Sequence, residues 1–195
     1  MRCIIATANP DKAAEIVAIV SSAIDLELIE RPKDIPDVEE TGETLLENAL
    51  LKAQAIFEAT GELTIADDTG LFVDALDGEP GVRSARFAGE HARYSDNVAK
   101  LLAEMRDADD RSARFETVAV AILPGGGHLI ATGTVEGIIT GEPAGSNGFG
   151  YDPVFAPLEA DGKTFAQLSS SEKAAMSHRG RAFQALATQV HQALA

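Results

Sequence analysis

Two adjacent acids, Asp67 and Asp68, are the strongest local indication of chemistry in this sequence. They follow the apolar run 63–66, which predicts a short strand, and Thr69 and Gly70 are expected to turn the chain. Neighbouring like charges repel, and a cation such as Mg²⁺, which takes carboxylate oxygens together with substrate phosphates, would remove the repulsion. The pair indicates either a metal-dependent phosphate site or a solvated turn, and these residues alone leave both open.

A second candidate site lies where the first predicted strand, residues 1–6, meets a predicted helix over residues 10–22. Asn9 is a good N-cap, and Pro10 suits the first helical position. A helix N-terminus offers free backbone N–H groups and the positive end of the helix dipole, which together attract anions. Thr7 and Asn9 could add hydrogen bonds and Lys12 a charge. Taken alone, this pattern is more often that of an ordinary capped helix.

A third group of candidates surrounds the next predicted helix. Glu40 precedes it, and Thr44 and Glu47 form the capping-box pattern that starts it. Asn48 and Lys52 share one face of this helix because their spacing is i and i+4. A lysine on such a face is usually solvated. Lys52 becomes of interest because carboxylates precede it and others follow the next strand.

Two segments of the second half carry groups that could recognise a purine base. The loop 146–153 places Phe149 between glycines, so that its ring could stack on a base while Asp152 accepts a hydrogen bond from the base edge. Packing of Phe149 into the core is the alternative. Lys173, His178 and Arg179 gather near the start of the last predicted helix, and a lone histidine there would more often be structural.

The elements that must position these residues alternate between helix and strand at the start of the chain. The second half contains a hairpin signal, because two Val-, Ile- and Thr-rich runs flank the turn 124–127. This pattern predicts an α/β protein with a mixed sheet. The remaining expected elements are a strand over 26–29, a helix from 44 to about 61, a helix over 94–105, hairpin strands over 115–123 and 128–139, and helices over 172–176 and 179–193.

The composition places limits on partners and location. The chain has 195 residues and a formal net charge of −15, which disfavours binding to a nucleic acid backbone but does not exclude a small nucleotide. No apolar run approaches the ~20 residues that span a bilayer, and the first residues do not form a signal peptide. We therefore expect no membrane partner and a cytoplasmic location. Cys3, the single cysteine, is expected to be buried.

In their order along the chain, these motifs resemble the non-canonical purine nucleoside triphosphate pyrophosphatases, also called inosine or xanthosine triphosphatases. The matching blocks cover nearly the whole chain. They comprise residues 7–12, 40–42, 47–49, 52–53, 66–71, 80–81, 84–86, 148–153, 172–173 and 177–180. Asn147, Leu45 and Phe87 depart from the common residues of the family, and only local packing is affected; asparagine is the non-glycine residue that best tolerates positive φ.

The resemblance implies a role for each matching residue. Asp68 looks like the general base that activates water, and Glu40 and Asp68, with Asp67 beside them, look like the Mg²⁺ carboxylates. Phe149 looks like the stacking platform. The implied base-edge readers are Asp152, His178 and Arg179, the implied triphosphate cradle is Thr7, Asn9, Lys12, Lys52 and Lys173, and the matched blocks add Ala8, Pro10, Asp11, Thr69, Gly150 and Tyr151 to the substrate-binding residues.

The resemblance further implies an inosine-triphosphatase-like fold: a mixed twisted sheet with flanking helices, and two lobes around a central cleft. We expect a single pyrophosphatase domain over residues 1–195, acting as a homodimer. The implied reaction is Mg²⁺-dependent hydrolysis of triphosphates such as dITP, ITP and XTP to the monophosphate and pyrophosphate, which cleanses the nucleotide pool. His178 and Arg179 are donors that would favour a 6-oxo purine over adenine.

Three other functions compete with this one. A phosphatase of the haloacid-dehalogenase type needs a nucleophilic aspartate after its first strand, where this chain has residues 7–9, Thr-Ala-Asn. A nucleotide-binding module without turnover would bind inosine triphosphate tightly and not hydrolyse it. A housekeeping interaction protein is the third alternative, and the ordered set of motifs disfavours it.

Overall fold

The computed structural model describes all residues, Met1–Ala195, and they divide into two compact units. The first unit contains Met1–Asp68, Thr117–Gly133 and His178–Ala195, and the second contains Thr69–Glu116 and Thr134–Ser177. Three strands, β3 (Leu63–Val73), β5 (Ser112–Ile122) and β6 (His128–Ile139), continue from one unit into the other. The expectation of one functional domain over residues 1–195 stays a prediction.

The sheet is mixed, as the sequence predicted. Its strand order is β2-β1-β3-β5-β6-β7, and β4 (Pro80–Gly81) pairs with β3. β1 (Arg2–Ile5) runs parallel to both β2 (Glu27–Glu30) and β3. β7 (Phe155–Pro157) pairs antiparallel with β6. Parallel pairing at the N-terminal edge and antiparallel pairing after the hairpin together confirm the α/β class.

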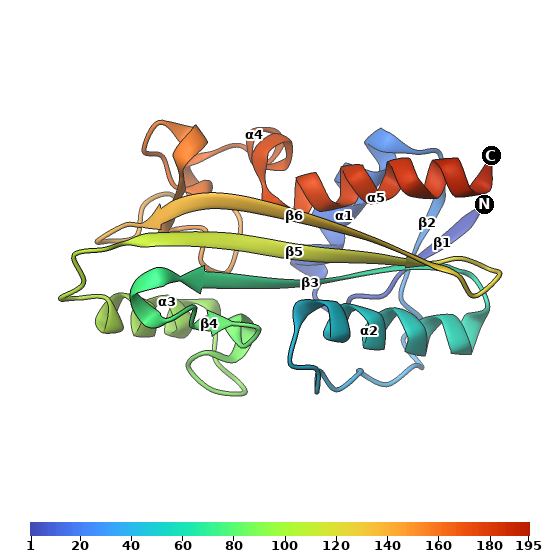
Figure 1. Cartoon of the computed structure of the whole chain (residues 1–195), viewed down its shortest axis with the longest axis horizontal. Helices are drawn as coiled ribbons and strands as arrows, with labels where there is room; N and C mark the ends of the chain where they lie inside the picture. The colour runs from blue at the N-terminus through green and yellow to red at the C-terminus, as the bar shows by residue number, and fades with distance from the viewer. The chain divides into compact units, whose positions relative to one another are not determined.

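In the first unit, local signals define helices at the expected places. α1 (Pro10–Ala23) begins after Asn9, and α2 (Leu45–Thr60) has the predicted capping box and ends at Gly61 in the left-handed conformation. α5 (His178–Leu194) closes the chain and packs against α1. Figure 1 shows α1 and α5 on one side of the strands of this unit and α2 on the other. The ends of β1 and the starts of α1 and α5 thus bring polar side chains close to β3.

The second unit has a core in which the rings of three phenylalanines, Phe115, Phe155 and Phe165, pack against one another in edge-to-face and tilted arrangements. Its helices are α3 (Tyr94–Glu104) and α4 (Ser170–Met176). Short 3-10 turns connect the remaining segments and span Asp74–Leu76, Ser84–Arg86, Leu158–Ala160 and Phe165–Gln167.

The prediction that the chain turns at Thr69 and Gly70 is wrong, because β3 continues without a break from Leu63 to Val73. Both carboxylates are buried within the strand, and this is possible because lysine and arginine side chains from three helices approach them. Gly70 serves close packing rather than a turn: a Cβ there would lie 2.7 Å from the carbonyl oxygen of Gly81.

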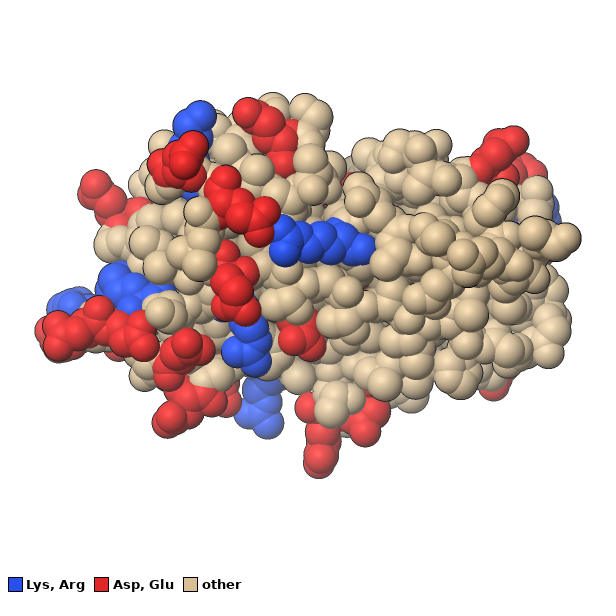
Figure 2. Space-filling view, turned by 45° about the horizontal axis from the view of Figure 1, so that its top comes forward, with Lys and Arg blue, Asp and Glu red and all other residues tan.

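The charged side chains are unevenly distributed on the face drawn in Figure 2, where most lie on the left of the view and the right half is largely uncharged. On the face drawn in Figure 2, lysine and arginine side chains are scattered among more widespread acidic ones. None of the helices combines the length and the apolar character needed to cross a lipid bilayer. Cys3 is buried in β1, as expected.

Candidate active site

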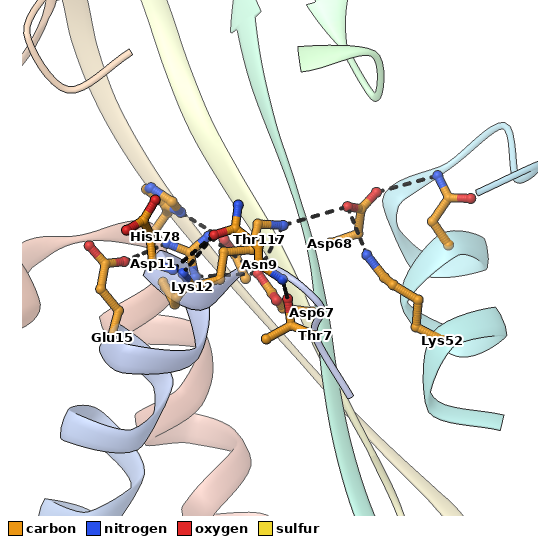
Figure 3. Close-up of polar contacts among 12 residues, drawn as sticks. Thr7, Asn9, Asp11, Lys12, Glu15, Lys52, Asp67, Asp68, Thr117 and His178 are labelled. Atoms are coloured by element: carbon orange, nitrogen blue, oxygen red, sulfur yellow. Dashed lines mark hydrogen bonds and ion pairs between the residues drawn. The ribbon is translucent and has the colours of Figure 1, made fainter. Parts of the chain in front are cut away.

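Asp68 lies at the centre of a buried group of charges in the first unit. Lys52 Nζ lies 2.7 Å from Glu40 Oε1 and 3.3 Å from Asp68 Oδ1, so one ammonium bridges two carboxylates. Lys12 Nζ approaches the same Asp68 oxygen to 4.0 Å and Asp67 Oδ2 to 3.6 Å. Figure 3 shows Lys12 reaching the aspartates from α1 and Lys52 reaching Asp68 from α2. The structure thereby brings together charged side chains from four separate segments of the sequence.

Burial changes the proton affinities of this group in a direction that suits acid–base chemistry. Burial raises the pKa of Asp68, although Lys52 and Lys12 oppose the shift. Burial also lowers the pKa of Lys12. For Lys52, burial acts in the same direction, but the attraction of Asp68, Asp67 and Glu40 outweighs it, and its pKa is raised. A carboxylate with a raised pKa is a stronger base towards water than an ordinary aspartate.

Asp67 shares Lys12 with Asp68 but also pairs with Arg179, because successive side chains on a strand point to opposite faces. Arg179 donates from Nε and Nη2 to Asp67 Oδ2, each at 3.3 Å, and from Nη1 to Glu15 Oε2 at 2.6 Å. The Arg179 side chain is 2% exposed. Its guanidinium is thus held by two carboxylates of the first unit, whereas the resemblance implied a contact with the base edge. That contact stays a prediction, and the structure assigns Arg179 a clear electrostatic role beside Asp67.

The turn between β1 and α1 is partly different from the expected anion cradle. Asn9 Oδ1 accepts the backbone N–H groups of Asp11 and Lys12, at 2.9 and 3.2 Å, and Thr7 Oγ1 accepts that of Asn9. The prediction that the first N–H groups of the helix are free is therefore wrong for Asp11 and Lys12. The Lys12 ammonium remains the positive group that this turn supplies. Ala8 and Pro10 are exposed on the same turn.

His178 is buried at the start of α5, and its Nδ1 lies 2.7 Å from Thr117 Oγ1 of β5. A Cβ on Gly133 would overlap the carbonyl oxygen of His178 and lie 2.6 Å from the Ala182 nitrogen, so the glycine allows β6 to approach the first turn of α5. Sequence reasoning did not find Thr117, and no local signal marks it. Glu15 was also missed, although its position at i+3 from Lys12 on α1 is a signal that could have found it.

In the second unit, Asp152 and Lys173 form a buried ion pair, with their side chains 4% and 7% exposed. Asp152 Oδ2 also accepts the Phe149 backbone N–H at 2.9 Å. A Cβ on Gly148 would overlap that oxygen, so only glycine fits there, with φ at +71°. Lys173 Nζ lies 4.9 Å from the centre of the Phe149 ring. Asp152 and Lys173 thus organise the Phe149 loop, and their roles towards the base edge and the triphosphate stay predictions.

Phe149 and Tyr151 of this loop differ in their surroundings. Phe149 is half-buried, and its ring contacts Tyr94 with centroids 5.7 Å apart. Tyr151 is 5% exposed within the apolar core, and its hydroxyl donates to the carbonyl oxygen of Ser84 at 2.9 Å. Burial raises the pKa of this hydroxyl. The Tyr151 side chain thus supports the loop that carries Phe149, and substrate binding at Tyr151 stays a prediction.

Asn147, Gly150 and Thr69 are three further residues named in the sequence predictions. Asn147 does not adopt the positive φ that asparagine tolerates; instead its Nδ2 donates to the carbonyl oxygen of Leu168 at 2.9 Å. Gly150 does have positive φ, at 64°. Thr69 is half-buried and directly follows Asp68 in β3, at the first residue of the second unit.

The carboxylates of the first unit fit a metal ion only where other ligands complete its coordination shell. No group of three or more histidine, cysteine, aspartate or glutamate side chains gathers closely enough to hold an ion alone. Magnesium is commonly bound through one or two carboxylates, with phosphate and water oxygens completing its shell. Glu40 and Asp68, which already share the cation Lys52, fit that requirement. Asp67 fits it less well, because its side chain is 0% exposed and Arg179 donates two hydrogen bonds to its Oδ2.

The comparison with protein families agrees with this arrangement, because the profile of the Ham1 family matches residues 3–189. The chain belongs to the Ham1 family. A relative named dITP/XTP pyrophosphatase from Streptomyces coelicolor is 46% identical over 99% of this chain and 98% of its own length. A Bacillus licheniformis protein of the same name is 46% identical over 97% of this chain and 98% of its own.

Solved structures of Ham1 proteins share the fold. The Coxiella burnetii HAM1 protein has a TM-score of 0.88 and 38% identity over 98% of this chain and 99% of its own. The Staphylococcus aureus Ham1 protein has a TM-score of 0.87 and 39% identity over 99% of this chain and 100% of its own. These similarities confirm the family that the motif order indicated and the mixed α/β fold implied by it.

Proposed function

We propose that this Ham1-family chain hydrolyses non-canonical purine nucleoside triphosphates, such as dITP and XTP, to the monophosphate and pyrophosphate. The observation that carries the proposal is the placement of Asp68, a buried carboxylate of raised pKa with two lysine ammonium groups beside one of its oxygens. The names of the relatives that match nearly the whole chain supply the substrate class.

In the proposed reaction, Asp68 accepts a proton from a water molecule that attacks phosphorus at the α–β phosphoanhydride. The bond from that phosphorus to the bridging oxygen breaks, which releases the monophosphate and pyrophosphate. Lys12 and Lys52 attract the phosphate oxygens, whose negative charge increases as pyrophosphate leaves. Glu40 and Asp68 would hold Mg²⁺, which supplies charge neutralisation on those oxygens when bound. Arg179 and Glu15 keep Asp67 fixed beside this group.

Two side chains, Phe149 and His178, are proposed to recognise the base. The ring of Phe149 in the second unit offers a stacking surface, held in place by Tyr94, Lys173 and Asp152. In the first unit, Nδ1 of His178 faces Thr117, so the ring N–H proposed to donate to a 6-oxo group is that of Nε2. Adenine has an amino donor at that position and would leave such a donor unpaired.

A homodimer and a cytoplasmic location belong to the same proposal, and the family resemblance supports both. Sedimentation of the purified protein would test the first. We expect the mass of a dimer. The mass of a monomer, at the protein concentration used in the activity assay, would contradict the homodimer.

Product analysis tests the reaction directly. Pyrophosphate and phosphate release would be measured in Mg²⁺ from dITP, XTP, GTP and ATP in parallel, with Asp68→Asn as the control variant. We expect pyrophosphate, mainly from dITP and XTP, and little from the variant. Phosphate as the product would indicate a phosphatase. Similar rates with all four would refute the selectivity, and tight inosine triphosphate binding without turnover would indicate a binding module.

A further inference from the structure

Asn48 connects two parts of the candidate site without being one of its charged groups. It lies in α2 one turn before Lys52 and is 0% exposed. Its Oδ1 accepts the backbone N–H of Gly42 at 2.8 Å. Its Nδ2 donates to Asp68 Oδ2 at 3.3 Å and lies 3.5 Å from the carbonyl oxygen of Gly42. A single buried amide therefore contacts both the loop that follows Glu40 and the proposed base.

The orientation of this amide follows from its partners. The two ends of an asparagine side chain are hard to distinguish by shape, so hydrogen-bond partners must decide between them. The Gly42 N–H can only donate, and the atom facing it must be the amide oxygen. The Nδ2 group, which can only donate, then faces Asp68. Asp68 Oδ2 is in consequence an acceptor, and Oδ1 is the oxygen that Lys52 and Lys12 approach.

Gly42 shows that the Asn48 contact depends on close packing. A Cβ at this position would lie 2.6 Å from Glu47 Cβ and 2.7 Å from Asn48 Oδ1. Only glycine leaves room for the loop to reach the amide. Gly42 is two residues after Glu40. The Glu40 carboxylate accepts a hydrogen bond from Lys52, which lies in α2 like Asn48. Asn48 and Lys52 thus hold the Glu40 loop and Asp68 together from one face of α2.

We propose that Asn48 is a positioning residue for hydrolysis: it fixes the Asp68 carboxylate through Oδ2, so that Oδ1 is the atom that takes the proton from water. This inference rests on the proposed function of Asp68. It goes beyond that function because it separates the roles of the two carboxylate oxygens and assigns the separation to a neutral side chain.

Asn48→Asp is the sharpest variant, because it keeps an acceptor for Gly42 and replaces the donor facing Asp68 by an oxygen. Asn97 provides a matched control in the second unit. It is 2% exposed, accepts the Ala88 N–H at 2.7 Å and donates to the Ala85 carbonyl at 3.0 Å, so it links backbone groups in a similar way. Asn97→Asp should lower the midpoint of urea unfolding and leave kcat within about twofold. Asn48→Asp should lower kcat roughly 10²-fold with little change in KM, the scale of a general base.

A double-variant cycle with Asp68→Asn completes the test. If Asn48 acts through Asp68, the Asn48→Asp change lowers kcat much less in the Asp68→Asn background. The urea midpoint provides a readout that needs no turnover: Asn48→Asp should lower it more when residue 68 is a carboxylate than when it is an amide. Equal midpoint losses in both backgrounds, or a kcat loss in Asn97→Asp as large as in Asn48→Asp, would overturn the inference. Absence of any triphosphate hydrolysis by the unaltered protein would refute the proposed function instead, and the midpoint cycle would still decide whether Asn48 acts on Asp68.

Discussion

Replacement of Lys52 by methionine tests the electrostatic logic of the site most directly. The side chain has nearly the same length and apolar stem, so the change removes chiefly the ammonium group that bridges Glu40 and Asp68. Lys52 is 12% exposed, Asp68 6% and Glu40 27%. Removing one partner of a buried ion pair costs about 3–5 kcal/mol, because the remaining charge is left uncompensated. Glu40 can turn partly towards water, so we expect a loss near the lower end, about 3 kcal/mol.

The assay is urea unfolding followed by circular dichroism, at neutral pH and without divalent metal. Arg2→Met serves as the control, because Arg2 pairs with Glu62 at 3.0 Å with the two side chains 54% and 34% exposed. A surface pair of that kind contributes about 0–1 kcal/mol. Adding Glu40→Gln to Lys52→Met should recover part of the stability, since it removes one uncompensated charge.

A loss of stability in Lys52→Met no larger than that in Arg2→Met would refute the reasoning. It would show that water solvates the Glu40 and Asp68 carboxylates well enough without the ammonium group. Added Mg²⁺ gives a second, independent result. A dication at the same carboxylates should stabilise Lys52→Met more than the unaltered protein, since binding to the folded state raises stability by mass action. The same stabilisation in both proteins would argue against Glu40 and Asp68 as the metal carboxylates.

Three further predictions concern pH, backbone packing and base binding. Because burial raises the pKa of Asp68 above its ordinary 3.8, the active carboxylate form is lost as pH falls through this raised pKa; kcat should therefore decline at a higher pH than an exposed aspartate allows, and Asp68→Asn should lose this limb. Gly133→Ala should lower the melting temperature, since its Cβ would overlap the His178 carbonyl oxygen, whereas Gly125→Ala meets open space; equal melting temperatures would contradict this. Phe149→Leu should raise KM for dITP by roughly tenfold, as loss of about 1–3 kcal/mol of base stacking predicts, and an unchanged KM would exclude stacking.

Elements that depend on neighbouring residues were predictable from the sequence. Asn9 and Pro10 begin α1, and the Thr44 capping box and Gly61 bound α2, because these signals act through hydrogen bonds and backbone conformations a few residues apart. The hairpin of β5 and β6 also lies where the glycine-rich turn placed it. The order of the motifs identified the family.

The surroundings of the polar residues required the tertiary structure. Asp67 and Asp68 looked like the end of a strand, because nothing near them in sequence can compensate two buried charges. The compensating groups come from α1, α2 and α5 through Lys12, Lys52 and Arg179, and only the folded chain brings them to β3. The sequence by itself thus determined which residues carry charge and where helices begin. The fold decided which charges meet, because a carboxylate is tolerated in the interior only where distant segments supply its cations and hydrogen bonds.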